Sequence, residues 1–125
     1  MNGNLSHLSD EDLRNLFTDL AIKQGDAWPP ADPNTIGRYD KLDFEIVDVM
    51  EELQSRPGDA RRILIPLLEH ENPHVRLKTA TNAFALVPEQ ARRALQSLHE
   101  SAPAPACHAA GRFLDAVDMG MYVPT

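Results

Sequence analysis

A stretch of thirteen residues occurs twice in the chain, and this repetition decides the fold. Pro57–Glu69 reads PGDARRILIPLLE, and Pro88–Glu100 reads PEQARRALQSLHE. Seven positions are identical, and each identical pair is separated by 31 positions. A period of about 20–50 residues is typical of proteins in which one small structural unit stacks on the next. A unit of this length fits a pair of antiparallel helices, so residues 57–87 and 88–118 are predicted to form two such units.

Apolar spacing predicts helices along the whole chain. Ser9 is expected to cap a first helix, in which apolar residues recur every three or four positions until about Lys23 and Gly25 ends the helix. Further helices are predicted at about 34–55, 60–70, 73–87, 88–99 and 106–117, the second of these five kinked by Pro66. No segment alternates with a period of two, so no sheet is expected. The predicted fold class is all-α: an α-α superhelix with about six helices in three antiparallel hairpins, forming a single domain over residues 1–125.

The segment Ile63–Ala80, ILIPLLEHENPHVRLKTA, resembles a HEAT repeat. That family has a proline inside its first helix, an Asn-Pro turn, Val-Arg at the start of the second helix and an alanine where the helices touch. The matching residues are Pro66, Asn72, Pro73, Val75, Arg76 and Ala80. The whole chain is similar to small, stand-alone bacterial HEAT-like domains of unassigned function. The resemblance implies a HEAT- or armadillo-like superhelix that acts as a scaffold or adaptor, because stacked second helices present a continuous surface.

Composition and charge narrow the class of partner. The single cysteine, Cys107, excludes an internal disulfide, and no apolar run approaches the ~18 residues of a membrane helix. The first residues lack the pattern of a signal peptide, so a cytoplasmic protein is expected. Residues 1–55 hold four Lys or Arg against twelve carboxylates, a net of −8. This acidic half disfavours nucleic acid and favours a protein partner with a basic surface, although solubility alone is the alternative explanation.

The exposed face of the predicted helix 34–55 is the main candidate for partner binding. Asp40, Phe44, Asp48 and Glu51 fall on one side of it at spacings of three and four. An aromatic ring among carboxylates suits a basic, partly apolar segment, whereas a solvated face with one stray phenylalanine is the alternative. Lys78 and Asn82 on the predicted helix 73–87 complete the candidate surface. The predicted function is a non-catalytic protein-interaction module, either immunity- or antitoxin-like or regulatory, without a cofactor.

Two alternatives come from other functional classes. Residues 70–74, His-Glu-Asn-Pro-His, match the H-E-x-x-H pattern of zinc hydrolases, in which both histidines share one face of a continuous helix. Pro73 is expected to break that helix, so no metal site is predicted there. The other alternative is a homodimeric or small-ligand-binding module, in which Trp28, Phe44 and the residues after Val117 form a patch.

The repeated arginine pairs have a structural explanation and a functional one. In each pair, Arg61-Arg62 and Arg92-Arg93, one arginine could stack against the next repeat while the other is solvated. An electropositive ridge on the outer helices is the functional alternative, and a solvated charge ladder is favoured over it. Arg76 is expected to form an ion pair with Glu69 or Glu71 rather than to clamp an anion.

Overall fold

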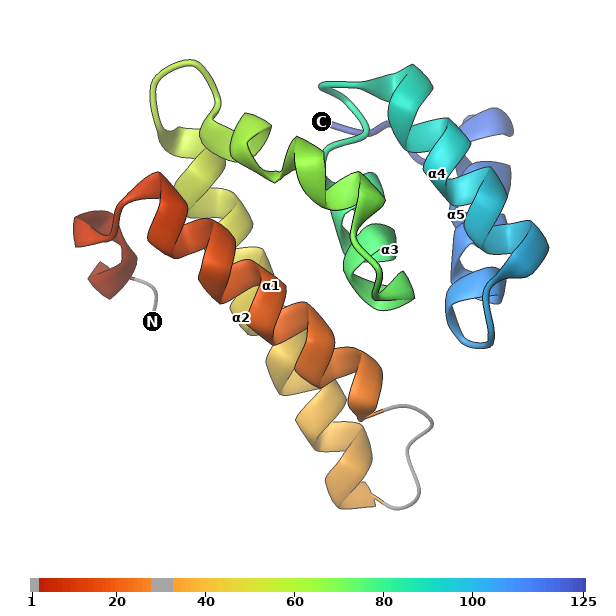
Figure 1. Ribbon diagram of the computed structural model, residues 1–125, viewed down its shortest axis with the longest axis horizontal. Coiled ribbons are helices and arrows are strands. Elements are labelled where there is room, and N and C mark those ends of the chain that lie inside the picture. The colour runs from red at the N-terminus through yellow and green to blue at the C-terminus, as the bar shows by residue number, and fades with distance from the viewer. Residues whose placement is uncertain (1–2, 28–32) are drawn as a thin grey trace. The chain divides into compact units, whose positions relative to one another are not determined.

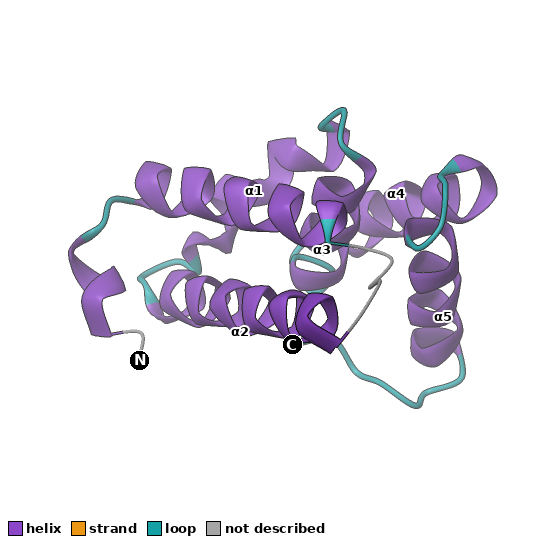
Figure 2. Cartoon of the chain, turned by 90° about the horizontal axis from the view of Figure 1, so that it is seen from below, coloured by secondary structure: helices purple, strands orange, loops and turns teal. Residues whose placement is uncertain are grey.

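All regular elements in the described part of the chain are helices. The computed structural model describes residues 3–27 and 33–125, and no strand occurs in these ranges (Figure 2). The elements are η1 (Gly3–His7), α1 (Asp10–Asp26), α2 (Pro33–Ser55), η2 (Ala60–Glu69), α3 (Pro73–Asn82), α4 (Pro88–Ser101) and α5 (Ala106–Asp118), where η marks a 3-10 helix. The all-α fold is therefore confirmed, and the six predicted helices correspond to α1, α2, η2, α3, α4 and α5.

The chain forms two compact units, Met1–Ile63 and Leu64–Thr125. The boundary between them lies within η2, inside the predicted repeat 57–87. In both ranges that the structure describes, no helix combines the length with the apolar composition needed to cross a bilayer.

In the first unit, α1 and α2 form an antiparallel hairpin (Figure 1). The side chain of Ser9 accepts a hydrogen bond from the amide of Asp12 at 3.0 Å, which confirms the predicted N-cap of α1. Each helix buries one stripe of its surface against the other, as the apolar spacing predicts. The buried apolar residues are Leu13, Phe17, Leu20 and Ala21 on α1 and Leu42, Ile46, Val49, Met50 and Leu53 on α2.

Polar side chains hold both ends of this hairpin. At one end the fully buried Gln24 donates to the carbonyl of Tyr39 at 3.3 Å and to Oδ1 of Asp43 at 3.1 Å. At the other end Arg56 donates to Oδ1 of Asp10 at 2.8 Å and to the carbonyl of Leu5 at 3.1 Å. The two bonding sites fix the register of α2 on α1, because a shifted helix would leave buried polar atoms without partners.

The prolines set the local geometry of η2 and α3. Pro66 lacks the amide hydrogen that an α-helix needs, and its ring crowds the carbonyl four residues earlier, so Ala60–Glu69 forms a 3-10 helix instead of the predicted kinked α-helix. Asn72 then caps α3 by accepting hydrogen bonds from the amides of His74 and Val75 at 2.9 and 3.3 Å, with Pro73 in the first turn. The predicted break and restart at this point is confirmed.

The second unit has one apolar core, to which η2, α3, α4 and α5 contribute. Helices α4 and α5 are antiparallel neighbours (Figure 1), and α3 packs on both of them. The core consists of Leu68, Leu77, Ala80, Phe84, Ala91, Leu95, Leu98, Ala106, Ala110 and Leu114. Leu64 and Leu95, which are equivalent in the two copies of the repeated stretch, are both fully buried.

Two predicted helix ends are wrong. Helix α1 continues through Gly25 to Asp26, because a glycine weakens a helix without stopping it and the amides at the end of α1 still find carbonyl partners. Helix α3 ends at Asn82 rather than at residue 87, and residues 83–87 form turns in which Ala83 and Phe84 are still buried. The apolar pattern predicted burial here correctly, but burial does not require a helix.

Two glycines in α5 and beyond it have distinct roles. A Cβ atom at Gly111 would lie 2.6 Å from Nδ1 of His99, so this glycine permits the close approach of the end of α4. His99 Nδ1 lies 3.0 Å from the carbonyl oxygen of Cys107. Gly120 has φ 74°, and the amides of Gly120 and Met121 bond to the carbonyls of Val117 and Ala116. This is the Schellman arrangement that ends many α-helices.

Gly120→Ala is expected to destabilise the protein by about 1 kcal/mol, because alanine is strained in the left-handed region. Gly37→Ala, on the exposed side of α2 with no atom near the added Cβ, is expected to stabilise it by about 0.5–1 kcal/mol. Urea unfolding measures both free energies. Equal effects at the two glycines would contradict the Schellman assignment.

Candidate functional site

The outer face of α2 carries the predicted acidic and aromatic residues together. Asp40 and Glu51 are exposed, Asp48 is half-buried, and Phe44 is 72% exposed. Val47, which the sequence analysis did not single out, is 42% exposed and lies next to Phe44 on the same face. We call these five residues the α2 acidic face. It joins two apolar side chains with three carboxylates over about three turns of helix.

The carboxylates of α2 fall into two groups according to the direction they face. Asp43 accepts a hydrogen bond from Gln24, and Glu52 accepts one from Arg56 at 3.0 Å, so both are used within the first unit. Asp40, Asp48 and Glu51 form no side-chain hydrogen bond or ion pair with any residue that the structure describes. The oxygen atoms of these three carboxylates are therefore available to accept hydrogen bonds from solvent or from a partner.

The two predicted residues of α3 are less accessible. Lys78 and Asn82 are both half-buried, and they belong to the second unit, whereas the α2 acidic face belongs to the first. Asn82 Nδ2 donates to the carbonyl of Lys78 at 2.8 Å, so its amide serves the end of α3. The observed bond gives Asn82 a local structural role.

The H-E-x-x-H pattern does not lie on a continuous helix. His70 follows η2, and its Nδ1 accepts a hydrogen bond from the amide of Asn72 at 2.9 Å. His74 lies in the first turn of α3 and is buried. The Asn72–Pro73 break thus separates the two imidazoles. In the described ranges, no group of three or more His, Cys, Asp or Glu side chains is arranged to hold a metal ion.

Arg76 does not form the predicted ion pair. Its Nε is buried and has no hydrogen-bond partner among the described residues. Glu69 and Glu71 are both exposed, whereas Arg76 is half-buried. The different depths of these side chains explain why the sequence spacing did not produce a pair.

The first arginine of each repeated pair is bonded within the protein. Arg61 is buried and donates through Nε and Nη2 to the two carboxylate oxygens of Asp59, at 2.9 and 2.7 Å. This bidentate bond lowers the pKa of Asp59, and desolvation opposes the shift. The Asp59 carboxylate also accepts a hydrogen bond from the amide of Arg61, at the start of η2.

Arg92, the equivalent of Arg61, has different partners. It donates to both oxygens of Asp118, at 2.8 and 3.2 Å, which lowers the pKa of Asp118, and its guanidinium carbon lies 5.8 Å from the centre of the Phe84 ring. The second arginines, Arg62 and Arg93, are exposed. In each pair, the first arginine is therefore bonded to a carboxylate and the second is exposed.

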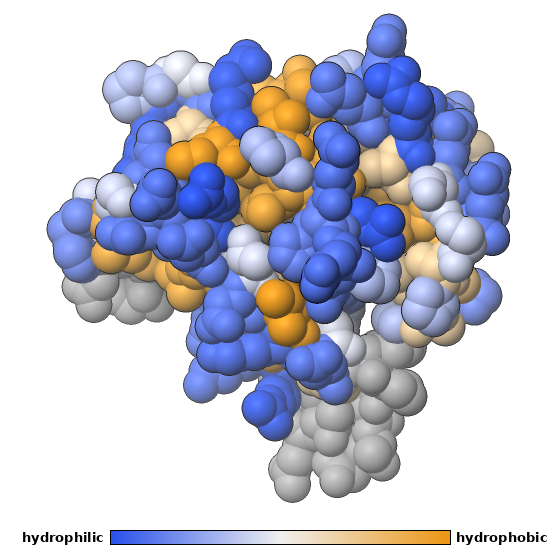
Figure 3. Space-filling model, viewed as in Figure 1, coloured by the Kyte–Doolittle hydropathy of each residue, from blue (hydrophilic) through white to orange (hydrophobic). Residues whose placement is uncertain are grey.

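The residues of the predicted dimer or ligand patch are described only in part. Trp28 lies outside the described residues. Three residues after Val117 are exposed: Met119, Met121 and Val123. The Tyr122 ring contacts the Phe113 ring edge-on, with 5.6 Å between the ring centres. Figure 3 shows that hydrophilic residues cover most of the face in view, with smaller apolar areas between them.

Comparison with known proteins gives a family without an assigned role. Residues 11–118 match the family described as a domain of unknown function, DUF2019. The crystal structure of the protein RPA1889 from Rhodopseudomonas palustris CGA009 is similar, with a TM-score of 0.89 and 33% sequence identity, and the match covers 97% of this chain and 98% of that one. No curated protein matches the chain.

The ion pair of Asp59 predicts a specific pH dependence. Because the folded pKa of Asp59 is lowered, its contribution to stability is present above the unfolded pKa of about 3.9 and is lost as the pH falls through the folded pKa. Asp59→Asn keeps a residue that tolerates the observed φ of 58°. It is expected to destabilise by about 1 kcal/mol at pH 7, where it removes a charged hydrogen-bond acceptor.

Urea unfolding of both proteins between pH 2.5 and 7 measures this difference, which should shrink below about pH 4. Asp118→Asn is the matched control, since it removes the equivalent and more exposed partner of Arg92, and its effect should be smaller. An Asp59→Asn effect of constant size across the pH range would contradict the ionic explanation.

Proposed function

Since the chain belongs to the DUF2019 family, whose function is unknown, we propose a function from its own surface: a non-catalytic module that binds a protein partner through the α2 acidic face. The partner would carry a basic, partly apolar segment. The observation that supports this proposal best is the exposure of Phe44 and Val47 among three carboxylates that no described side chain neutralises.

The arrangement suits recognition by opposite charge combined with apolar anchoring. Carboxylates around an apolar centre attract and orient a basic partner, whereas burial of the aromatic side chain supplies affinity. The net charge of −7 strengthens the attraction at long range and opposes the approach of nucleic acid. This charge fits a regulatory or immunity-like role toward a basic protein in the cytoplasm.

The position of this face on α2 also supports the proposal. The opposite side of α2 is occupied by α1, and the ends of the hairpin are held by Gln24 and Arg56. A partner would therefore meet a helix whose orientation is already fixed, which limits the entropy lost on binding.

Reversal of the three outer charges tests the electrostatic part. The variant Asp40→Lys, Asp48→Lys, Glu51→Lys is expected to weaken partner binding at least about tenfold, because like charges then oppose the basic segment. The immobilised protein first captures partners from a bacterial lysate, and each captured protein is then titrated against both proteins by calorimetry.

The matched control reverses three exposed carboxylates of the second unit, Glu71→Lys, Glu100→Lys and Asp115→Lys, and gives the same change in net charge. If both triple variants weakened partner binding equally, the change in net charge alone would explain the effect. That result would contradict binding at a specific face. A partner that binds both variants as tightly as the unchanged protein would also refute the proposal.

Substitution of Phe44 tests the apolar part. Phe44→Ser is expected to change the free energy of unfolding by less than about 0.5 kcal/mol, because the ring is largely exposed. The same variant should weaken binding of the captured partner about tenfold or more. A loss of several kcal/mol in stability would show that the ring is part of the fold rather than of a binding surface.

A further inference from the structure

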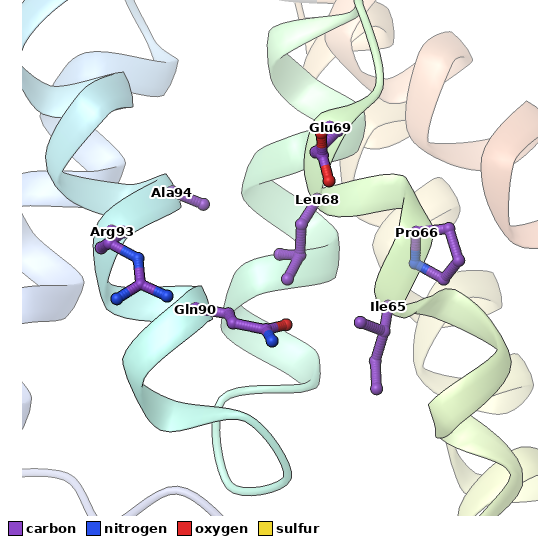
Figure 4. A pocket seen from close by; sticks show the side chains of 7 residues that line it. All are labelled: Ile65, Pro66, Leu68, Glu69, Gln90, Arg93 and Ala94. Atoms are coloured by element: carbon purple, nitrogen blue, oxygen red, sulfur yellow. The ribbon is translucent and has the colours of Figure 1, made fainter.

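The second unit contains a hollow, and none of the five residues of the α2 acidic face lines it. It has a volume of about 660 Å³ and lies between η2 and α4 (Figure 4). Ile65, Pro66 and Leu68 from η2 and Ala94 from α4 form its apolar part. The small side chain of Ala94 leaves space on the α4 side, and the volume falls in the range of about 300–1,000 Å³ that is typical of ligand sites.

The 3-10 geometry of η2 shapes one wall of this hollow. In a 3-10 helix, side chains three positions apart lie directly above one another, so Ile65 and Leu68 form one continuous apolar ridge. In Figure 4 Leu68 extends from η2 into the space and Gln90 extends from α4 toward η2. The hollow thus depends on Pro66, which keeps η2 from forming an α-helix.

The rim of the hollow carries groups of both signs. Arg93 and Gln90 lie on α4, and Glu69 lies on η2. All three are exposed, and their side chains form no hydrogen bond or ion pair with any residue in the described part of the chain. The neighbouring Arg92, in contrast, is bonded to Asp118. The rim therefore presents available hydrogen-bond donors and an available acceptor around the apolar part of the hollow.

A second hollow adjoins the first. It has a volume of about 320 Å³ and is lined by Val87, Pro88 and Glu89, together with Gln90 and Arg93. Because Gln90 and Arg93 line both hollows, these two side chains form the ridge between them. A ligand that enters both hollows must cross this polar ridge.

We propose that the two hollows bind an extended peptide segment of a partner protein, with one aliphatic side chain in each hollow. An extended chain places side chains i and i+2 on the same side, about 6.6 Å apart, with the backbone between them. Its carbonyl groups accept hydrogen bonds from Arg93 and Gln90, and its amides donate to Glu69 and Glu89. A rim of mixed sign complements the peptide backbone, which carries donors and acceptors together, better than it complements an ion of either sign.

Two blocked peptides of identical composition test the proposal. In acetyl-Gly-Leu-Ser-Leu-Gly-amide the leucines are at i and i+2, whereas in acetyl-Gly-Leu-Leu-Ser-Gly-amide they are adjacent and point to opposite sides. Titrations followed by amide resonances of the ¹⁵N-labelled protein should show shifts at η2 and α4. The second peptide should bind about tenfold more weakly, because one leucine then stays in water.

Three variants locate the site. Ala94→Leu should weaken binding by narrowing the hollow, while Arg93→Gln and Glu69→Gln should each weaken it about fivefold by removing a charge-assisted hydrogen bond. Arg112→Gln and Glu100→Gln are the controls, since both residues are exposed and line neither hollow. Circular dichroism verifies that each variant is folded.

Several results would overturn the proposal. Equal affinity for the two peptides, or resonance shifts confined to residues outside η2, Val87 and α4, would exclude the extended mode. If leucinamide bound as tightly as the first peptide, the hollow would be assigned to binding of a small amphiphile. If the resonances of these helices shifted with protein concentration in the absence of peptide, the hollow would be assigned to binding of a second copy of the chain.

Discussion

Burial of one apolar stripe per helix is the constraint on which the rest of the structure depends. In the hairpin of α1 and α2, this stripe lies between two polar bonding sites, at Gln24 and at Arg56. Once the stripe is paired, every other position of α2 has a fixed environment. Asp43 is bonded internally for this reason, and Asp48 and Glu51 remain available on the far side. The binding surface that we propose is thus a direct result of packing.

The two copies of the repeat keep the same environment at only some positions. Leu64 and Leu95 are both fully buried, whereas Ala60 and Leu67 are half-buried and their equivalents Ala91 and Leu98 are buried. Arg61 and Arg92 are also equivalent, yet Arg61 bonds to a carboxylate two residues earlier and Arg92 bonds to one at the end of α5. A long, flexible arginine can reach different acceptors from the same position of the repeat.

Apolar spacing and capping residues allowed most of the fold to be predicted from the sequence. Ser9 and Asn72 have short side chains that bond locally, so their roles can be recognised without tertiary information. The α2 acidic face was predicted except for Val47, since a valine within the run Ile46-Val47-Asp48-Val49 does not reveal whether a neighbouring helix covers it. The burial of Gln24 and the unpaired Nε of Arg76 depend on how side chains distant in the sequence pack around them. The spacing of residues along the chain does not predict that packing.

The contact of His99 with Gly111 supplies a natural spectroscopic reporter. The imidazole lies so close to the glycine that a Cβ atom there would overlap with it. An aromatic ring at this range alters the local magnetic field, so the α-protons of Gly111 should resonate away from the usual glycine region while α4 and α5 stay together. Their return to ordinary frequencies would report separation of this helix pair in solution, without any label or mutation.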